Sequence, residues 1–401
     1  MPHLRSRYAE PLLKKFLAHS SIVGVLGQRQ TGKTTLAAAL SQAYVTLDLS
    51  ETQDQVNQNP LGFLAGRQLP FTIDECQLVP DLFPALKEWV RLHPKKGQFI
   101  LTGSVRFTSR KAIRESLTGR IINLELLPMS IAESNSEPLP RQLLEWIGLR
   151  TFHDVPVISK QLIEKGKQRF QQFLEAGGLP GVCFFREKHV RAARLETHLE
   201  TLLERDIRLL VNTTATYRQL RMLARWVALN QGMPLNFSDI ARTVGVSPPS
   251  VKKLISAFES MFLVRTLSVE NLPSSVAFFE DQGLATHLIA DQREPQLDLV
   301  RGLHANLVPQ FLYRPELAAR FSQYRTRGGA CIQWMVQTEA GSIGVVPVAG
   351  PEASLSALAS SRSFLAHYPE AKVIIAHQGY ECKKISDRIL SIPYPLLLSD
   401  V

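Results

Sequence analysis

GQRQTGKT (27–34) is the stretch of this 401-residue sequence that decides the fold. It fits the pattern Gly-x-x-x-x-Gly-Lys-Ser/Thr and stands between an apolar run, SIVGVLG (21–27), and an Ala/Leu-rich run, TTLAAALSQAY (34–44). A strand before the loop and a helix after it are the context in which this pattern cradles phosphate. We therefore predict a phosphate-binding loop, with a fortuitous Gly-rich turn as the alternative.

Each residue type in this loop has a physical role. The glycines let the backbone curl so that successive N–H groups surround phosphate oxygens, and the helix that follows adds the positive end of its dipole. Lys33 would reach the β and γ phosphates of ATP, and the Thr34 hydroxyl would ligate Mg²⁺. The loop residues predicted to bind the nucleotide are Gly27, Gln28, Arg29, Gln30, Thr31, Gly32, Lys33, Thr34 and Thr35.

An apolar run that ends in two acids, LPFTIDE (69–75), follows the loop. Asp74 is predicted to hold the magnesium ion through a water, and Glu75 to orient and deprotonate the attacking water. Adjacent carboxylates repel each other unless a cation or a hydrogen-bond network offsets the repulsion. The alternative is a pair of acids in a solvated turn.

A third β-rich run, QFILTGS (98–104), supplies two hydroxyl groups. In a P-loop topology the end of this strand lies beside the γ phosphate, so we expect Thr102 or Ser104 to hydrogen-bond the phosphate or the water; alternatively, Ser104 caps a helix. Arg120 stands just before the strand IINLELLPMS (121–130) and is predicted to stabilise transition-state charge on a neighbour's nucleotide. A solvated surface arginine is the alternative there.

Composition and charge favour a soluble protein that can attract polyanions such as nucleotides or nucleic acid. No apolar run approaches the roughly 18 residues of a membrane span, and the N-terminus lacks the pattern of a signal peptide, so we expect a cytoplasmic protein. The four cysteines lie far apart, which indicates reduced thiols rather than structural zinc. The net charge of +10 divides into +5 for residues 1–150, +6 for 151–270 and −1 for 271–401.

Residues 235–268 predict a winged helix: a helix, a tight turn at Gly245, a second helix, and a strand. As a DNA reader, the second helix would bring Ser250, Lys252 and Lys253 to the duplex. As a structural lid, the same unit would merely cover the nucleotide. The second helix offers two lysines but no Arg or Asn that would contact base edges, so both interpretations stay open.

These motifs resemble a prokaryotic AAA-type P-loop ATPase family with a C-terminal domain of unknown function. The stretches that carry the resemblance across essentially the whole chain are RSRY (5–8), GQRQTGKTTL (27–36), IDECQ (73–77), LTGS (101–104), TGR (118–120), LLPMSIAE (126–133), FLEAGGLPGV (173–182) and LLERDI (202–207).

The resemblance implies an α/β protein in three parts: an AAA-type ATPase core (1–150), a helical lid with a winged helix (151–270), and a restriction-endonuclease-like domain (271–401). It implies that Lys33, Thr34, Asp74 and Glu75 keep the roles given above and that Arg120 is an arginine finger. It also implies that Gly178 and Pro180, in a Gly-Leu-Pro turn, touch the nucleotide from the lid. A plain backbone turn is the alternative for that tripeptide.

The sequence departs from this family in its last third. Nucleases of this fold need an acid on one strand and an acid-x-Lys on the next. Here the matching stretches read GGACIQ (328–333) and VPVA (346–349), and the helix before them reads GLHAN (302–306). We therefore predict a catalytically inactive nuclease fold.

The sequence predicts a Mg²⁺-dependent ATPase that acts as a conformational switch or remodeller, with homo-oligomers completing its site. Two other functions stay open. One is an ATP-binding switch with little turnover, and the other is a DNA-associated defence or repair ATPase.

Overall fold

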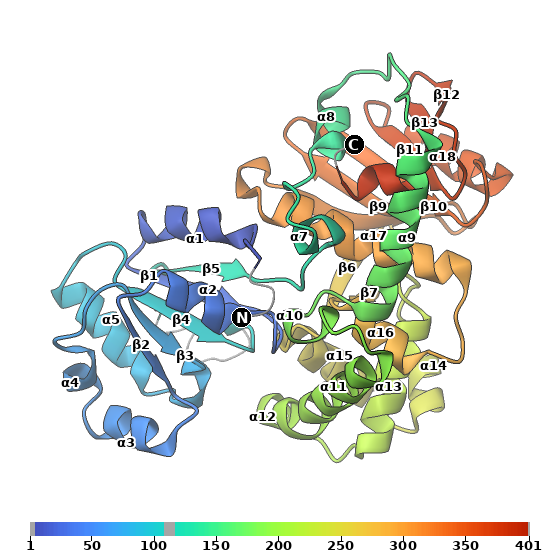
Figure 1. Ribbon diagram of the computed structural model, residues 1–401. Helices are drawn as coiled ribbons and strands as arrows, with labels where there is room; N and C mark the ends of the chain where they lie inside the picture. Colours follow the sequence, from blue (N-terminus) through green and yellow to red (C-terminus); the bar gives the residue numbers. More distant parts are fainter. Residues whose placement is uncertain (1–4, 108–116, 400–401) are drawn as a thin grey trace.

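The computed structural model describes residues 5–107 and 117–399, and the N-terminal part is a parallel sheet with helices on both faces (Figure 1). Its five strands are all parallel, in the order β2-β3-β4-β1-β5. Their bounds are β1 (Ile22–Leu26), β2 (Ala43–Thr46), β3 (Phe71–Asp74), β4 (Phe99–Gly103) and β5 (Ile121–Glu125). The predicted parallel α/β core is therefore confirmed.

Two hydrophobic cores lie on opposite faces of this sheet, because successive residues of a strand point to opposite sides. Ile22 and Leu26 of β1 pack on the face covered by α3, α4 and α5, whereas Val23 and Val25 pack on the face covered by α1 and α2. The helices are α1 (Ala9–Leu17), α2 (Lys33–Ala39), α3 (Ser50–Gln58), α4 (Pro60–Leu64) and α5 (Leu82–Leu92).

The strand order decides where the polar motifs meet. Strand β4 pairs with β1 on one side and with β3 on the other, and all three run in the same direction. The C-terminal ends of parallel strands lie at one edge of the sheet, so the loop after β1 adjoins the ends of β3 and β4. The motifs 27–34, 73–77 and 101–104 therefore converge.

A helical part follows the core. It runs from α9 (Lys160–Ala176) through α10 (Pro180–Cys183), α11 (Lys188–Glu200), a π-helix (Thr201–Asp206), α12 (Ile207–Leu210), α13 (Tyr217–Leu229), α14 (Phe237–Val244) and α15 (Pro248–Ser260) to α16 (Gln282–Leu288). Gly245 ends α14 in the left-handed region at φ 74°, and the Ser247 hydroxyl caps α15. Both helices and their turn form where the sequence predicts them.

An antiparallel hairpin of β6 (Val264–Glu270) and β7 (Ser275–Phe279) follows α15 and joins a second, eight-stranded sheet. Its order is β12-β13-β11-β10-β9-β8-β6-β7. The other strands are β8 (Arg320–Arg325), β9 (Cys331–Thr338), β10 (Gly341–Val348), β11 (Lys372–His377), β12 (Lys383–Ser386) and β13 (Ile389–Pro393). The predicted division after residue 270 falls in the turn of this hairpin, so one sheet runs across it.

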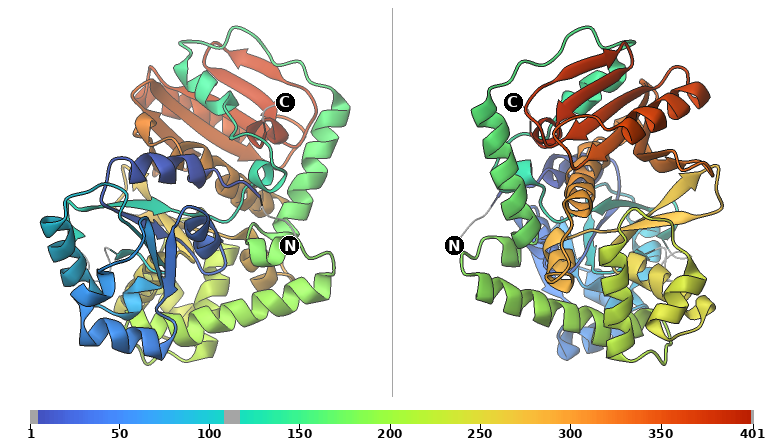
Figure 2. Two further views of the ribbon diagram at one scale, coloured as in Figure 1. Left: turned by 60° about the vertical axis from the view of Figure 1, so that its left-hand side comes forward. Right: turned by 90° about the vertical axis from the view of Figure 1, so that its right-hand side faces the viewer.

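Helices cover both faces of the second sheet (Figure 2). Val373 and Ile375 of β11 pack in the core beneath α18 (Leu355–His367), and Ile374 and Ala376 pack in the core shared with α17 (Pro295–Leu312) and α9. Within the described ranges, no helix is both long enough and apolar enough to span a membrane.

Residues 131–152 belong with this second sheet. Helix α7 (Ile131–Ser134) leads into α8 (Gln142–Gly148), whose Trp146 and Ile147 side chains lie in the same core as β10 and β11. The Lys372 ammonium donates to the Ile147 carbonyl at 3.1 Å. The chain thus leaves the first sheet before the predicted boundary at residue 150, because the apolar side of α8 packs on the C-terminal sheet.

Candidate functional site

The loop after β1 has its shape because two positions admit only glycine. A Cβ at Gly27 would lie 2.2 Å from the Leu126 carbonyl oxygen, so any side chain there would clash with backbone. Gly32 has a φ of 91° and immediately precedes α2. The left-handed region suits glycine, and it turns the chain so that the amides of the new helix face the loop.

A cavity of about 690 Å³ lies over this loop. Its walls come from the loop and α2, from the N-terminal segment, from the end of β3 and from the helical part. Ligand pockets in proteins commonly fall in the range of roughly 300–1,000 Å³. Of the predicted loop residues, six line the cavity: Arg29, Gln30, Gly32, Lys33, Thr34 and Thr35.

The remaining loop residues lie behind the cavity. Gly27, Gln28 and Thr31 are buried, and the Thr31 hydroxyl donates to the Gln28 carbonyl at 2.8 Å. The Lys33 ammonium donates to the same carbonyl at 3.0 Å. Burial lowers the pKa of Lys33, while the carboxylates of Glu75 and Asp74 act in the opposite direction. The lysine is thus held between the loop and the acids.

Asp74 joins the loop helix to the strands beside it. Its buried carboxylate accepts hydrogen bonds from the hydroxyls of Thr34 at 2.9 Å and Tyr44 at 2.8 Å, and from the Thr102 hydroxyl. Hydroxyl and carboxylate oxygens are the hard donors that Mg²⁺ prefers. Thr34 and Asp74 lie together, as the sequence predicts, and their chemistry fits that ion.

Glu75 follows in the left-handed region, at φ 53° and ψ 40°. Its carboxylate accepts hydrogen bonds from the Gln77 amide and from the Ser104 hydroxyl, the latter at 3.2 Å. The two adjacent acids therefore have separate hydrogen-bond networks, which offset their repulsion. Thr102 and Ser104 contact these carboxylates.

The N-terminal segment holds the loop from the other side. The buried Arg7 guanidinium donates to the carbonyls of Thr31 at 2.5 Å and Leu127 at 2.6 Å, and pairs with Glu133 at 2.9 Å. Charge-assisted bonds of this kind are stronger than neutral ones. Arg7 thus fixes the loop to the segment after β5.

The helical part contacts the loop through an ion pair. Arg29 pairs with Asp206, the last residue of the π-helix, at 2.5 Å. Pro180 and Gly181 line the cavity as well, with the Pro180 Cγ 3.9 Å from a Cβ placed on Gly32. π-helical turns are rare and often mark functional positions.

Gly178 is outside the lining of the cavity. Its amide donates to the Asp281 carboxylate at 2.7 Å, and its carbonyl accepts from the Met129 amide at 2.7 Å. A Cβ there would lie 2.1 Å from the Met129 carbonyl oxygen. The glycine therefore allows close packing of two backbones, which corresponds to the backbone-turn alternative.

Arg120 lies at the end of the sheet where strands β1 and β5 begin, whereas the cavity lies at the end where β1 finishes. Arg120 is exposed in the turn before β5, and β5 begins beside Ile22, where β1 begins. Five strand residues at roughly 3.3 Å each separate this end from the loop, a distance of about 16 Å. Arg120 therefore lies too far away to contact a nucleotide in this cavity, and its action on a neighbour's nucleotide stays a prediction.

The candidate DNA contacts lie on α15. Lys252 and Lys253 are exposed, and the Ser250 amide donates to the capping hydroxyl of Ser247 at 3.3 Å. DNA contact by this helix stays a prediction.

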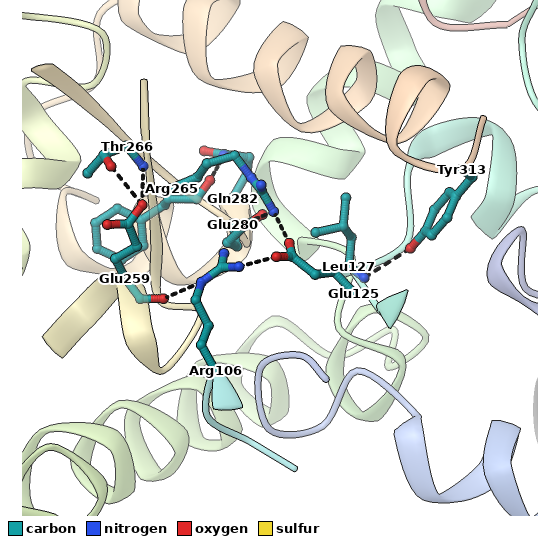
Figure 3. Close-up of polar contacts among 10 residues, drawn as sticks. Arg106, Glu125, Leu127, Glu259, Arg265, Thr266, Glu280, Gln282 and Tyr313 are labelled. Carbon is teal, nitrogen blue, oxygen red and sulfur yellow. Dashed lines mark hydrogen bonds and ion pairs between the residues drawn. The ribbon is translucent and has the colours of Figure 1, made fainter. Parts of the chain in front are cut away.

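An ion network connects the core with the hairpin (Figure 3). Arg265 of β6 pairs with Glu125 of β5 at 2.7 Å and with Glu280 at 2.8 Å, while Arg106, after β4, also pairs with Glu125. The Arg106 amide donates to the Ser260 carbonyl at 2.7 Å. Strands β4 and β5 of the core are thus tied to the helix-turn-helix and to the hairpin.

Several contributors to the site escaped the sequence analysis: Arg7, Tyr44, Gln77, Glu133, His198 and Asp206. Four of them fall within stretches that carry the family resemblance, which is the one signal that pointed to them. Tyr44 and His198 carry no such signal.

Together, fold and site define a P-loop ATPase-like core. Comparison with known families agrees: residues 19–135 match the family described as AAA domain, and residues 167–293 match a domain of unknown function, DUF8612. The prediction of an AAA-type P-loop core is confirmed. The second match ends at residue 293, and the predicted restriction-endonuclease-like fold of the C-terminal domain stays a prediction.

Similarity to individual proteins is more distant. Two uncharacterized proteins, from Mycobacterium tuberculosis and Mycobacterium bovis, are each 24% identical to it over 99% of this chain and 85% of theirs. A Walker-type ATPase of Pyrococcus abyssi is 14% identical, with a TM-score of 0.39 over 70% of this chain and 94% of that one. The Hsp104–ADP complex of S. cerevisiae is 12% identical, with a TM-score of 0.30 over 78% and 44%.

The ion network makes a prediction about stability. Burial would raise the pKa of Glu125, but Arg265 and Arg106 outweigh it and lower the pKa to about 2. Because this folded-state pKa lies below the ordinary value, the stabilisation is present above about pH 4.5 and is lost as the pH falls toward 2. Glu125→Gln should lower the free energy of unfolding by about 3–5 kcal/mol at neutral pH, because it leaves two largely buried arginines without this partner.

Urea unfolding across this pH range measures the difference between wild type and variant. The difference should shrink below about pH 4.5. Exposed Glu370→Gln is the matched control and should change stability little. Equal stability of Glu125→Gln and wild type at neutral pH would contradict the role given to the network.

Proposed function

We propose that this protein binds ATP with Mg²⁺ in the cavity over the loop and hydrolyses it. The observation that carries the proposal is the convergence of Lys33, Thr34, Asp74 and Glu75 beside one cavity, which the helical part closes from the other side. Each of these side chains has the chemistry that phosphoryl transfer to water requires.

The chain's own residues supply positioning and charge. Lys33 and the loop amides would hold the phosphates, and Thr34 and Asp74 would hold Mg²⁺, which neutralises charge on the phosphate oxygens. Glu75, oriented by Gln77 and Ser104, would accept a proton from the attacking water. The water oxygen then bonds to the γ phosphorus as the bond to the β-phosphate bridging oxygen breaks.

The lid contacts support the proposal that nucleotide state moves the helical part. Arg29 is both a cavity residue and the loop's partner for Asp206. A bound triphosphate offers Arg29 a competing anionic partner, so binding and the position of the π-helix are coupled. This is the physical basis for a conformational switch or remodeller.

We propose that the C-terminal domain is an inactive nuclease-like fold used for packing or binding. In the helix segment 302–306, where nuclease relatives place an acid, the chain has His304. Its ring stacks on Phe278 at 3.8 Å and accepts a hydrogen bond from the Trp334 indole at 3.2 Å. Aromatic packing thus occupies this helix segment, in which the resemblance would place an acid.

Glu75→Gln distinguishes an ATPase from a binding switch. Removal of the base should lower ATP turnover by about 10²–10⁴-fold while ATP binding persists. Phosphate release and equilibrium binding of labelled ATP measure the two effects, and exposed Glu370→Gln is again the control. Unchanged turnover would mean that Glu75 is not the base and would favour the binding switch.

Arg120 tests the oligomeric site. If it acts between subunits, ATP turnover per subunit should rise with protein concentration, and Arg120→Ala should lower it by about 10³-fold or more while ATP still binds. Exposed Arg150→Ala is the control. A concentration-independent rate in the wild type, or full activity of Arg120→Ala, would exclude a finger from a neighbour.

A further inference from the structure

His198 is a buried histidine on the wall of the nucleotide cavity. It belongs to α11, which closes the cavity from the helical part, and its side chain is 2% exposed. Its helix neighbours Leu195 and Leu199 pack into the hydrophobic core of that part. The imidazole therefore stands where this core meets the cavity.

The Nε2 atom of His198 has no hydrogen-bond partner within the described residues. A buried polar atom without a partner costs free energy, so such atoms are few in folded proteins. Thr201, one turn further along, also lines the cavity, but its hydroxyl donates to the Thr197 carbonyl at 2.9 Å. Of His198 and Thr201, the imidazole is the one that has a ring nitrogen open to a ligand.

His198 shares the cavity with charged groups of the phosphate-binding loop. The cations of Arg29 and Lys33 lie near enough to act on the imidazole. The acids beside these cations are Glu75, which lines the cavity, and Asp206, which pairs with Arg29. Arg5, Glu10 and Ala39 also line the cavity.

We propose that His198 donates a hydrogen bond from Nε2 to a phosphate oxygen of the bound nucleotide and so joins the helical part to the ligand. This inference rests on the proposed function and adds to it a positioning residue from the lid. The bond has no counterpart in the empty cavity, and it therefore favours the arrangement of α11 over the loop when phosphate is present.

The charge state of His198 gives the proposal a distinctive signature. Burial, with Arg29 and Lys33 as further causes, lowers the pKa of the free imidazole to about 4, so it is neutral at neutral pH. A phosphate at Nε2 brings negative charge and reverses the influence of the two cations. The pKa should rise on binding, and binding should take up protons between the two values.

The test compares four proteins by equilibrium binding of labelled ATP with Mg²⁺ at about pH 6 and about pH 8. They are wild type, His198→Phe, His198→Gln and His189→Gln. His198→Phe keeps an aromatic ring without a donor, and His198→Gln keeps a donor that does not titrate. His189 is an exposed histidine of the same helix and serves as the matched control.

His198→Phe should bind ATP about ten-fold more weakly than wild type, because a hydrogen bond to a charged group is lost. His198→Gln should recover part of this loss. Wild type and His189→Gln should gain affinity at the lower pH relative to both His198 variants. Protonation of ATP itself affects all four proteins equally and cancels in the comparison.

Two outcomes separate this inference from the proposed function. If wild type binds ATP and His198→Phe and His198→Gln match it at both pH values, His198 does not contact phosphate and the inference is overturned, while the proposed function stands. If wild type shows no binding of ATP, the proposed function itself fails and this inference fails with it. Thermal melts of each variant establish that it is folded.

Discussion

The buried carboxylate of Asp74 is the constraint on which the rest of the site depends. A charged group this far from solvent must be fully hydrogen-bonded, and hydroxyls from α2, β2 and β4 meet that need. The same bonds fix the start of α2 against the strand ends. The loop, the two acids and the Thr102–Ser104 strand end are thereby held in one geometry before any ligand arrives.

The helical part and the hairpin are attached to the loop and to the core strands at several separate points. Asp206 pairs with Arg29 of the loop, and the Gly178 carbonyl accepts a hydrogen bond from the Met129 amide in the segment after β5. Glu280, next to Asp281, belongs to the ion network that reaches β4 and β5 through Arg265. A displacement at the strand ends therefore has a physical route to the helix-turn-helix, the hairpin and the C-terminal sheet.

The P-loop core could be predicted because its information is local. Apolar runs that end in polar motifs predicted the strands, the loop between them, and the proximity of Thr34 to Asp74. Contacts between distant residues could not be predicted: Arg29 and Asp206 lie 177 positions apart, and a buried arginine such as Arg7 leaves no periodic pattern.

Two other features could be found only from the three-dimensional arrangement. The distance of Arg120 from its own cavity follows from the strand register. The continuation of one sheet across residue 270 follows from the pairing of β6 with β8, which no local composition reports. The restriction-endonuclease-like fold of the C-terminal domain stays a prediction that the family resemblance implies.

Calorimetric titration of the folded protein with ATP, with and without Mg²⁺, tests the central claim most directly. We expect saturable heat that depends on Mg²⁺ in wild type and is lost in Lys33→Ala, because that ammonium lies in the cavity beside Glu75 and Asp74. Absence of heat in wild type, or the same heat in Lys33→Ala, would contradict the assignment of this cavity to a nucleotide.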